Sequence, residues 1–205
     1  MSLQILNHPL AHHILALLRD QDTKEAHFRA LSTQITTLLV IEATRDVPLR
    51  AVEVKTPMET TQCRNISVSF SVVAIVRAGM SMIDAVIDLL PSVSVGFVGM
   101  ERDEETAEAH GYYCKLPPLA GKRVLLVDPM LATGGSAIQA LELVYANGAT
   151  DVSFLNIVAA PEGVASVSER FPEVDIYTAA LDRELNDRKY ILPGLGDFGD
   201  RLYGT

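Results

Sequence analysis

The clearest indication of architecture in the chain is the stretch Val124-Leu125-Leu126-Val127-Asp128-Pro129-Met130-Leu131-Ala132-Thr133-Gly134-Gly135-Ser136. It begins with a continuous apolar run, which is typical of a buried strand, and a short turn with two glycines follows. Beyond the turn, apolar residues recur at Ile138, Leu141 and Val144, as they do along one face of a helix. The stretch therefore predicts a strand, a loop and a helix in that order.

The loop in this stretch has the chemistry of a phosphate site. Gly134 and Gly135 carry no Cβ, so a ligand can lie directly on the main-chain N–H groups. Ser136 then begins the predicted helix, whose unpaired N–H groups and positive dipole end suit a phosphate. Asp128 would repel a phosphate, and its carboxylate suits sugar hydroxyls or a magnesium ion instead. Together these residues predict a site for a sugar phosphate.

Length and composition limit what the rest of the chain can be. The chain has 205 residues and no linker rich in Pro, Gly or Ser, which predicts a single domain over residues 1–205. With 48% hydrophobic residues a sizeable core is available. The formal charge of −9 and the scattered Lys and Arg residues disfavour a nucleic-acid surface. No apolar run is long enough to span a bilayer and no secretion signal is present, so we expect a soluble cytoplasmic protein.

Strand and helix patterns alternate along the chain, which predicts an α/β fold with a mainly parallel twisted sheet and helices on both faces. The predicted elements are, in chain order, helices over 10–19 and about 22–44, a small hairpin arm within 49–68, a strand over 72–76, a helix over 82–90, and strands over 93–100, 121–128, 152–159 and 174–180.

Two of these elements carry specific predictions. Asp22 and Glu25 have the spacing of a capping box at the start of the long helix. The apolar face of that helix is expected to contain Phe28, Leu31, Ile35, Leu38, Leu39 and Ile41. The hairpin arm is expected to project from the core, where it could pair with another subunit.

Three strands end next to charged residues. Arg77 follows the strand over 72–76, Arg102 follows the strand over 93–100, and Asp128 ends the apolar run quoted above. Because ligands bind at the carboxyl ends of strands in parallel sheets, we expect two guanidinium groups, a carboxylate and the phosphate loop to gather at one edge. The polar segment 101–113 beside this edge is expected to be a solvated loop that acts as a lid.

The last sixteen residues, 190–205, are dense in glycine. Gly194, Gly196 and Gly199 have the spacing of a dinucleotide-binding motif, but no strand leads directly into it and too few residues remain for a second strand. Glycines expose backbone N–H and C=O groups, which can match the edge of a flat heterocycle. The apolar residues of this tail predict that it is docked onto the core rather than free.

The stretch Asp128–Ser136 resembles the phosphoribosyl-diphosphate (PRPP) loop of the type I phosphoribosyltransferases. Pro129, where most of that superfamily has a second acidic residue, makes it similar to the uracil phosphoribosyltransferases in particular. The resemblance covers nearly the whole chain, and its other specific parts are 158–163 and 193–197. It implies the type I phosphoribosyltransferase fold with a C-terminal hood over the base. It also implies pyrimidine salvage, in which ribose 5-phosphate passes from PRPP to N1 of uracil and gives UMP and diphosphate with Mg²⁺.

The same resemblance implies a role for individual residues. Arg77 and Arg102 would bind the diphosphate, Asp128 the ribose hydroxyls, and the turn 133–136 the 5′-phosphate. The residues implied for PRPP are Arg77, Arg102, Asp128, Pro129, Met130, Leu131, Ala132, Thr133, Gly134, Gly135, Ser136 and Asp197, and those implied for uracil are Ile191, Gly196, Asp197 and Phe198. The catalytic group would consist of Arg77, Arg102, Asp128 and Asp197, with Asp197 near the metal, which PRPP and water would mostly hold. A homodimer or higher homo-oligomer and a GTP effector also follow as expectations.

One departure from the family and one backbone feature stand out. Glu101 precedes Arg102 where many relatives carry an aromatic residue, which leaves the geometry of the lid open. Arg77-Ala78-Gly79 is expected to hold a strained or cis peptide whose amides face the diphosphate.

Two other functions compete with this interpretation. A regulator with a PRPP fold that binds RNA would keep the phosphate loop but need a basic face, which the acidic balance opposes. A transferase for another base would need an added cation for orotate or an aromatic stack for a purine, for which Phe198 is a candidate.

Overall fold

The computed structural model describes residues 2–102 and 109–205, with side chains described outside 100–112. Its elements, in chain order, are β1 (Leu3–Ile5), α1 (Pro9–Arg19), α2 (Glu25–Ala43), β2 (Leu49–Lys55), β3 (Thr60–Ile66), β4 (Ser69–Val76), the 3₁₀ helix η1 (Ala78–Met82), α3 (Ile83–Leu89), β5 (Ser94–Arg102), β6 (Ala109–Lys115), β7 (Lys122–Val127), β8 (Met130–Leu131), α4 (Gly135–Ala146), β9 (Asp151–Ala159), α5 (Pro161–Arg170), β10 (Asp175–Leu181), β11 (Glu184–Leu185), β12 (Ile191–Leu192) and α6 (Phe198–Tyr203).

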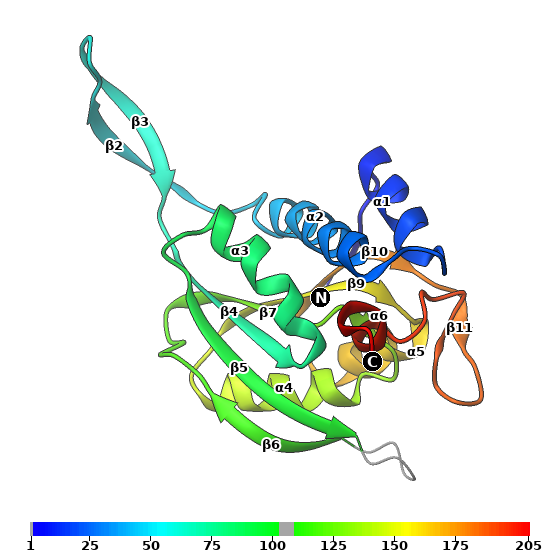
Figure 1. Cartoon of the computed structure of the whole chain (residues 1–205). Coiled ribbons are helices and arrows are strands. Elements are labelled where there is room, and N and C mark those ends of the chain that lie inside the picture. Colours follow the sequence, from blue (N-terminus) through cyan, green and yellow to red (C-terminus); the bar gives the residue numbers. More distant parts are fainter. Residues whose placement is uncertain (1, 103–108) are drawn as a thin grey trace.

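The central sheet has the order β1-β10-β9-β7-β4-β5-β6, and β8 extends β7 by pairing with β9. Every neighbouring pair is parallel except β5 with β6, which is antiparallel. Helices α1, α2 and α3 cover one face and α4 and α5 cover the other (Figure 1). The predicted α/β architecture with helices on both faces is confirmed.

Strand β4 illustrates why the sheet is buried on both sides. Val72 and Ala74 belong to the core under α2, whereas Val73 and Ile75 belong to the core under α4. Successive side chains of a strand point to opposite faces, so a continuous apolar run suits a sheet covered by helices twice.

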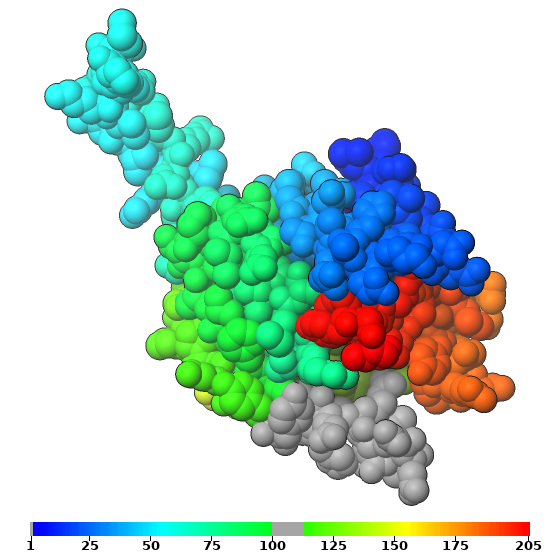
Figure 2. Space-filling model, viewed as in Figure 1, coloured from blue at the N-terminus to red at the C-terminus, as the bar shows by residue number. Residues whose placement is uncertain are grey.

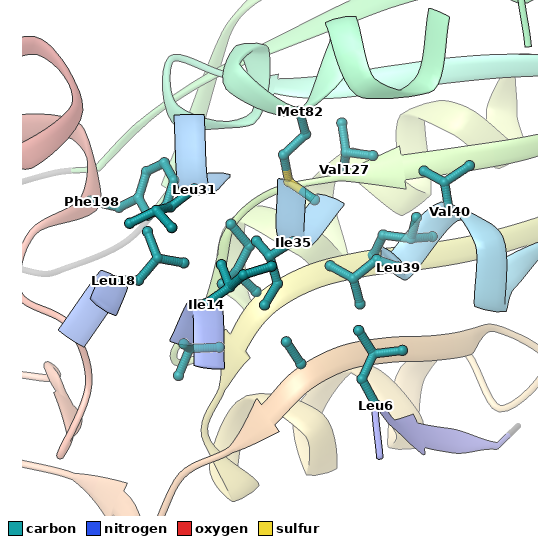
Figure 3. Close-up of a cluster of buried hydrophobic side chains, with 14 of the residues drawn as sticks. Leu6, Ile14, Leu18, Leu31, Ile35, Leu39, Val40, Met82, Val127 and Phe198 are labelled. Carbon is teal, nitrogen blue, oxygen red and sulfur yellow. The ribbon is translucent and has the colours of Figure 1, made fainter. Parts of the chain in front are cut away.

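The core under α2 joins parts that are far apart in the chain. Figure 3 shows Leu18 of α1, Ile35 of α2, Met82 of η1 and Phe198 of α6 around one cluster of buried side chains. Each of these four side chains is at most 2% exposed. The predicted docking of the C-terminal tail is therefore confirmed at Phe198 and the elements around it.

The start of α2 differs from the prediction. The helix begins at Glu25 after Lys24, without a capping side chain, so the predicted capping box is wrong. Asp22 instead lies in a turn, where its N–H donates to the Asp20 carboxylate at 2.9 Å and Thr23 N–H donates to the Asp20 carbonyl at 3.2 Å. The tight connection from α1 thus uses the residues that the pattern assigned to the cap.

The inward face of α2 is also less apolar than predicted. Ile41 is 49% exposed, while Ser32 and Thr36 are fully buried. Their hydroxyls donate to the carbonyl oxygens of Phe28 and Ser32, both at 2.7 Å. A hydroxyl that bonds within its own helix can be buried without another partner, which is why a search for apolar residues alone overlooks such positions.

Five strands were not predicted, namely β1, β6 and the two-residue strands β8, β11 and β12. β1 is a short edge strand parallel to β10, and β6 pairs antiparallel with β5 in part of the segment predicted as a loop. Edge strands tolerate polar side chains because one side faces solvent, so the polar sequence around β6 did not indicate a strand. The lid expected over 101–113 falls in part on residues 103–108, which lie outside the described residues.

The predicted hairpin is present as β2 and β3, paired antiparallel from Leu49↔Ile66 to Lys55↔Thr60. It projects from the body of the molecule (Figures 1 and 2), and nearly all its side chains are exposed. Its pairing with another subunit stays a prediction. Within the described residues, no helix is long and apolar enough to cross a membrane.

Candidate functional site

A cavity of about 450 Å³ opens at the carboxyl ends of the parallel strands. Two segments line most of it, one directly after β7 and one near the C-terminal end of the chain. The lining residues are Asp128, Met130, Leu131, Ala132, Thr133, Gly134, Gly135, Ser136, Ala137, Arg188, Lys189, Tyr190, Ile191, Gly196, Asp197 and Phe198.

We call residues 128–136 the phosphate loop. Hydrogen bonds to β9 hold its first half, since Asp128 N–H donates to the Leu155 carbonyl at 3.2 Å. The Pro129 carbonyl accepts from Ile157 N–H at 2.9 Å and from Val158 N–H at 3.0 Å. Pro129 is buried and is not part of the cavity lining, so its position favours anchoring the loop to the sheet over contact with a ligand.

The second half of the phosphate loop packs against α5. Gly134 has φ +88° and precedes the first residue of α4, and a Cβ added there would lie 3.1 Å from the Gly163 carbonyl oxygen and 3.2 Å from Ser166 Cβ. A Cβ added at Gly163 would in turn overlap the Ala132 carbonyl. Close backbone packing thus requires glycine at 163, and the positive φ with a tight contact favours glycine at 134. The first turn of α4 lines the cavity, and the N–H groups at a helix N-terminus can bind an anion.

Arg77 lies at the carboxyl end of β4, the neighbour of β7 in the sheet. A Cβ added at Gly79 would overlap the Val127 carbonyl, so η1 lies directly on the end of β7. The side chain of Arg77 is exposed and is not among the lining residues of the cavity. A cis peptide bond not preceding proline joins Val76 and Arg77. It lies immediately before Arg77-Ala78-Gly79, the tripeptide in which we expected a strained or cis bond.

Arg102 is the last residue of β5, which pairs with β4. The carboxyl ends of β7, β4 and β5 therefore point to the same edge of the sheet, and β5 continues three residues beyond Gly99, which pairs with the last residue of β4. The side chains of Glu101 and Arg102 lie outside the described residues.

We call residues 191–198 the C-terminal loop. It contains a cis bond between Leu192 and Pro193 and two glycines of positive φ, Gly194 at +61° and Gly196 at +83°. A Cβ at Gly194 would overlap the Ile191 carbonyl, which makes the turn specific to glycine.

The end of the C-terminal loop forms the first turn of α6. The Asp197 carboxylate accepts from Asp200 N–H at 3.0 Å and so caps the helix, which engages one of its two oxygens. The Phe198 ring is 2% exposed and meets the Phe28 ring edge-on at 5.1 Å between centroids. This ring is committed to the core, so it is not available to stack on a base.

The sequence did not single out the segment 188–190, which also lines the cavity. It belongs to the turn between β11 and β12, where the Asn186 side chain accepts from Arg188 N–H at 2.9 Å and from Tyr190 N–H at 3.0 Å. Arg188 and Lys189 bring two cationic side chains to a cavity in a protein of formal charge −9. The basic pair Arg188-Lys189, directly before the glycine-rich tail, is the sequence feature that could have indicated this part of the site.

Glu162 connects this turn to the phosphate loop region. Its carboxylate accepts from Leu185 N–H at 3.0 Å, and this backbone hydrogen bond holds the pKa of the carboxyl below its usual range. Glu162 lies in the first turn of α5, and α5 packs on Gly134. Helix α5 therefore contacts both the phosphate loop and the segment that leads into the 188–190 turn.

Comparison with known proteins assigns the chain to a family. A family model described as uracil phosphoribosyltransferase matches residues 5–205. The chain belongs to the uracil phosphoribosyltransferase family.

Individual relatives agree over the full length. The uracil phosphoribosyltransferase of Campylobacter curvus is 44% identical and covers 100% of this chain and 99% of its own length. That of Lacticaseibacillus paracasei is 49% identical, with 98% and 97% covered. The solved structure of the AQ2163 protein from Aquifex aeolicus superposes with a TM-score of 0.96 at 40% identity and covers 100% of this chain and 99% of that one.

More distant structures support the fold alone. A phosphoribosyltransferase from Corynebacterium diphtheriae matches with a TM-score of 0.53 at 15% identity, covering 83% of this chain and 96% of that one. The type I phosphoribosyltransferase fold that the resemblance implied is thus confirmed.

Proposed function

We propose that this protein is a uracil phosphoribosyltransferase that transfers the 5-phosphoribosyl group of PRPP to N1 of uracil in the cytoplasm and releases UMP and diphosphate. The observation that carries the proposal is the composition of one cavity. It joins the N-terminus of α4, a carboxylate at the end of β7 and a loop that contains Gly196.

The phosphate loop supplies the PRPP half of the site. The 5′-phosphate lies against the N–H groups at the start of α4, from Thr133 to Ser136, where the helix dipole favours negative charge. Asp128 accepts hydrogen bonds from the ribose hydroxyls. Arg188 and Lys189 add positive charge at the same cavity.

The C-terminal loop supplies the uracil half. Ile191, Gly196, Asp197 and Phe198 line the cavity through a segment whose glycines expose the main chain. Uracil alternates C=O acceptors and N–H donors along its edge, so backbone groups in a fixed geometry can pair with it. The burial of the Phe198 ring against Phe28 argues against the purine alternative, which needs a free aromatic face.

Catalysis rests on charge and position. Departure of diphosphate leaves positive charge on the ribose ring and adds negative charge to the leaving group, so cations at the leaving group lower the barrier. Arg77 at the end of β4 and Arg102 at the end of β5 are the residues we assign to it. No nucleophilic side chain is required.

Mg²⁺ fits this site only as a partner of PRPP. Among the described residues no three His, Cys, Asp or Glu side chains are grouped as metal ligands, and Asp197 has one oxygen engaged in capping α6. The free oxygen of Asp197 can hold one position of the ion, and phosphate and ribose oxygens with water would fill the others. When bound, the ion supplies further positive charge to the departing diphosphate.

A panel of free bases tests the function. The purified protein is incubated with PRPP, Mg²⁺ and uracil, cytosine, orotate or hypoxanthine, and nucleotide formation is measured. A site built to pair with one N–H/C=O edge rejects the wrong edge by about 10⁴–10⁵-fold, so cytosine should give almost no product, while a small 5-substituted uracil should be accepted. Comparable rates with cytosine and uracil would contradict the proposal.

The remaining partners are tested separately. Sedimentation measures the homo-oligomer that the family implies, and rates with and without GTP measure the effector. An RNA-binding regulator predicts instead a salt-dependent shift of RNA on a gel.

A further inference from the structure

An ion pair between a buried carboxylate and a partly buried arginine, neither of which lines the cavity, holds the C-terminal loop. Asp182, directly after β10, is 7% exposed and receives Arg19, the last residue of α1, through Nη2 at 2.5 Å and Nη1 at 2.9 Å. Such a two-pronged arginine–carboxylate contact fixes both the distance and the orientation of the two groups.

Both members of the pair also bind the backbone of Gly194. The Asp182 carboxylate accepts from Gly194 N–H at 2.8 Å, and Arg19 Nη1 donates to the Gly194 carbonyl at 2.6 Å. The two backbone polar groups of one residue are therefore fixed by one ion pair. Asp182 is itself fixed to the sheet, because its N–H donates to the Ala159 carbonyl at 2.8 Å.

A second arginine holds the next residue. Arg201 of α6 donates to the Leu195 carbonyl at 2.7 Å, and it also donates to the carbonyls of Leu18 and, at 2.5 Å, Asp20. Its guanidinium carbon lies 4.5 Å from the centre of the Phe28 ring. Burial lowers the pKa of Arg201.

Within the C-terminal loop, the residues held by these contacts are followed directly by residues that line the cavity. Gly194 and Leu195 are bound from behind and do not line the cavity, whereas Gly196, Asp197 and Phe198, which follow directly, do line it. We propose that Arg19 and Asp182, with Arg201, are positioning residues that set the backbone of 196–198 in register with the edge of uracil. This inference rests on the proposed function and names the residues that give it base affinity.

The size of the effect follows from the geometry. A backbone site recognises a base through short hydrogen bonds, and a displacement of about 1 Å can cost about 10² in rate. Lysine cannot replace the arginine fork, because its ammonium is a single point of charge. Arg19→Lys should therefore keep the charge but lose the contact with either the Asp182 carboxylate or the Gly194 carbonyl.

The test compares Arg19→Lys and Asp182→Asn with Arg170→Lys. Arg170 forms a matched but exposed pair with Glu142 at 3.2 Å, with side chains 65% and 48% exposed, and such surface pairs contribute little. We expect the KM for uracil to rise about tenfold or more in the two test variants, by the displacement argument above, while the KM for PRPP stays within about twofold. A parallel rise in both KM values, or an unchanged KM for uracil in a folded variant, would overturn the proposal.

Equilibrium binding separates the base from the sugar phosphate. UMP and ribose 5-phosphate share the phosphate and the ribose and differ in the base, so the test variants should bind UMP more weakly and ribose 5-phosphate as the wild type does. The double variant Arg19→Lys/Asp182→Asn should be no worse than the poorer single variant, since residues that act as a unit are not additive. Additive losses would count against a common role.

Hydrogen exchange keeps the inference testable if the function is wrong. Peptides that cover 191–198 should exchange faster in Arg19→Lys than in the wild type without any substrate, and peptides of the phosphate loop should not. If the wild type makes no UMP, the proposed function fails while this measurement still decides the positioning role. Unchanged exchange at 191–198 would refute it, and Asp182→Asn provides the same readout if Arg19→Lys does not fold.

Discussion

The phosphate loop directly follows a strand of the central sheet, whereas the C-terminal loop is attached to the rest of the molecule largely through side chains. The backbone carbonyls of Pro129 and Leu131 accept hydrogen bonds from the N–H groups of β9 and of Ala160 directly after it, and these bonds hold the first loop together with the close contact of Gly134 with α5. Arg19, Asp182 and Arg201 hold the second. One half of the cavity is therefore a feature of the sheet itself, and the other half depends on buried side chains such as Phe198 together with a few polar contacts that single substitutions can remove.

This difference has a functional counterpart. In the proposed reaction the first loop binds the sugar phosphate and the second binds the base. Substitutions near the sheet edge should therefore alter PRPP binding or turnover, and those behind the C-terminal loop should alter uracil binding. Three variants on the PRPP side and one far from both loops test this separation when they are compared with Arg19→Lys and Asp182→Asn.

The largest effect is expected for Arg77→Ala. Loss of one preorganised charge-stabilising donor costs about 10²–10³ in kcat, and we expect a fall of that size with the fold intact. Steady-state kinetics with saturating PRPP and uracil measure it, with Arg170→Ala as a matched exposed control. The substitution removes only the side chain. The hydrogen bond that Tyr203 of α6 donates to the Arg77 carbonyl at 3.5 Å can still form. Near-normal turnover would remove Arg77 from the mechanism.

The next effect is expected for Asp128→Asn. A hydrogen bond to a charged group contributes about 1.5–3 kcal/mol, so the KM for PRPP should rise about 10–100-fold. The KM for uracil should change little, which is the mirror image of the result expected for Arg19→Lys. An unchanged KM for PRPP would mean that Asp128 does not bind the ribose, and equal changes in both constants would break the division between the halves.

A smaller effect is expected for Gly134→Ala. The left-handed conformation costs a residue with Cβ about 1–2 kcal/mol, which for a chain of this size lowers Tm by about 2–4 °C per kcal/mol. Crowding against Gly163 and Ser166 should in addition raise the KM for PRPP. Gly121→Ala is the control, because Gly121 has φ +71° and a Cβ there would meet nothing within 4 Å. Gly121→Ala should lose a similar amount of stability in thermal denaturation and keep the wild-type KM for PRPP. If the KM for PRPP rises in both variants, crowding at Gly134 is not the cause of the rise.

The smallest effect is expected far from both loops, for Asp46→Asn. Asp46 bonds Arg123 at 2.7 Å, and this hydrogen bond lowers the pKa of Asp46. A lowered pKa means that the contribution to stability is complete above the pKa of the unfolded chain, about 3.9, and is lost as pH falls through the lower folded value. The Asp46 side chain is 67% exposed, so the difference in unfolding free energy at pH 7 should be under about 1 kcal/mol.

Denaturant titrations from pH 7 to pH 2 check this prediction, and kinetics at pH 7 should match the wild type for both substrates. A stability difference that grows as pH falls would contradict the assigned sign. Arg123 also bonds Asp151 at 3.0 Å, so the arginine keeps a partner in the variant.

The two loops also differ in how far the sequence could predict them. The phosphate loop is contiguous with its strand and its helix, so the apolar run, Gly134 and Gly135 identified it together. The C-terminal loop was assigned to the base through family resemblance. Its supports could not be predicted from the residues, because Arg19 and Gly194 are 175 positions apart and nothing in either neighbourhood points to the other.

The elements that the sequence missed share a physical cause. β6 is an edge strand with polar residues, and buried Ser32 and Thr36 satisfy their hydroxyls within α2. Apolar periodicity detects burial of carbon and not of hydrogen-bonded oxygen, and it does not detect a strand that needs only one neighbour. The basic pair at 188–189 was overlooked for a different reason, since a charged turn is typical of any surface.

The hairpin of β2 and β3 has a consequence for evolution rather than for chemistry. Nearly all its side chains face solvent, so the fold of this chain makes almost no packing demand on their identity. If selection acted only on the folding of one chain, the arm would accumulate substitutions faster than the strands of the core. If the arm diverges between relatives more slowly than its exposure predicts, contacts with other molecules constrain its sequence.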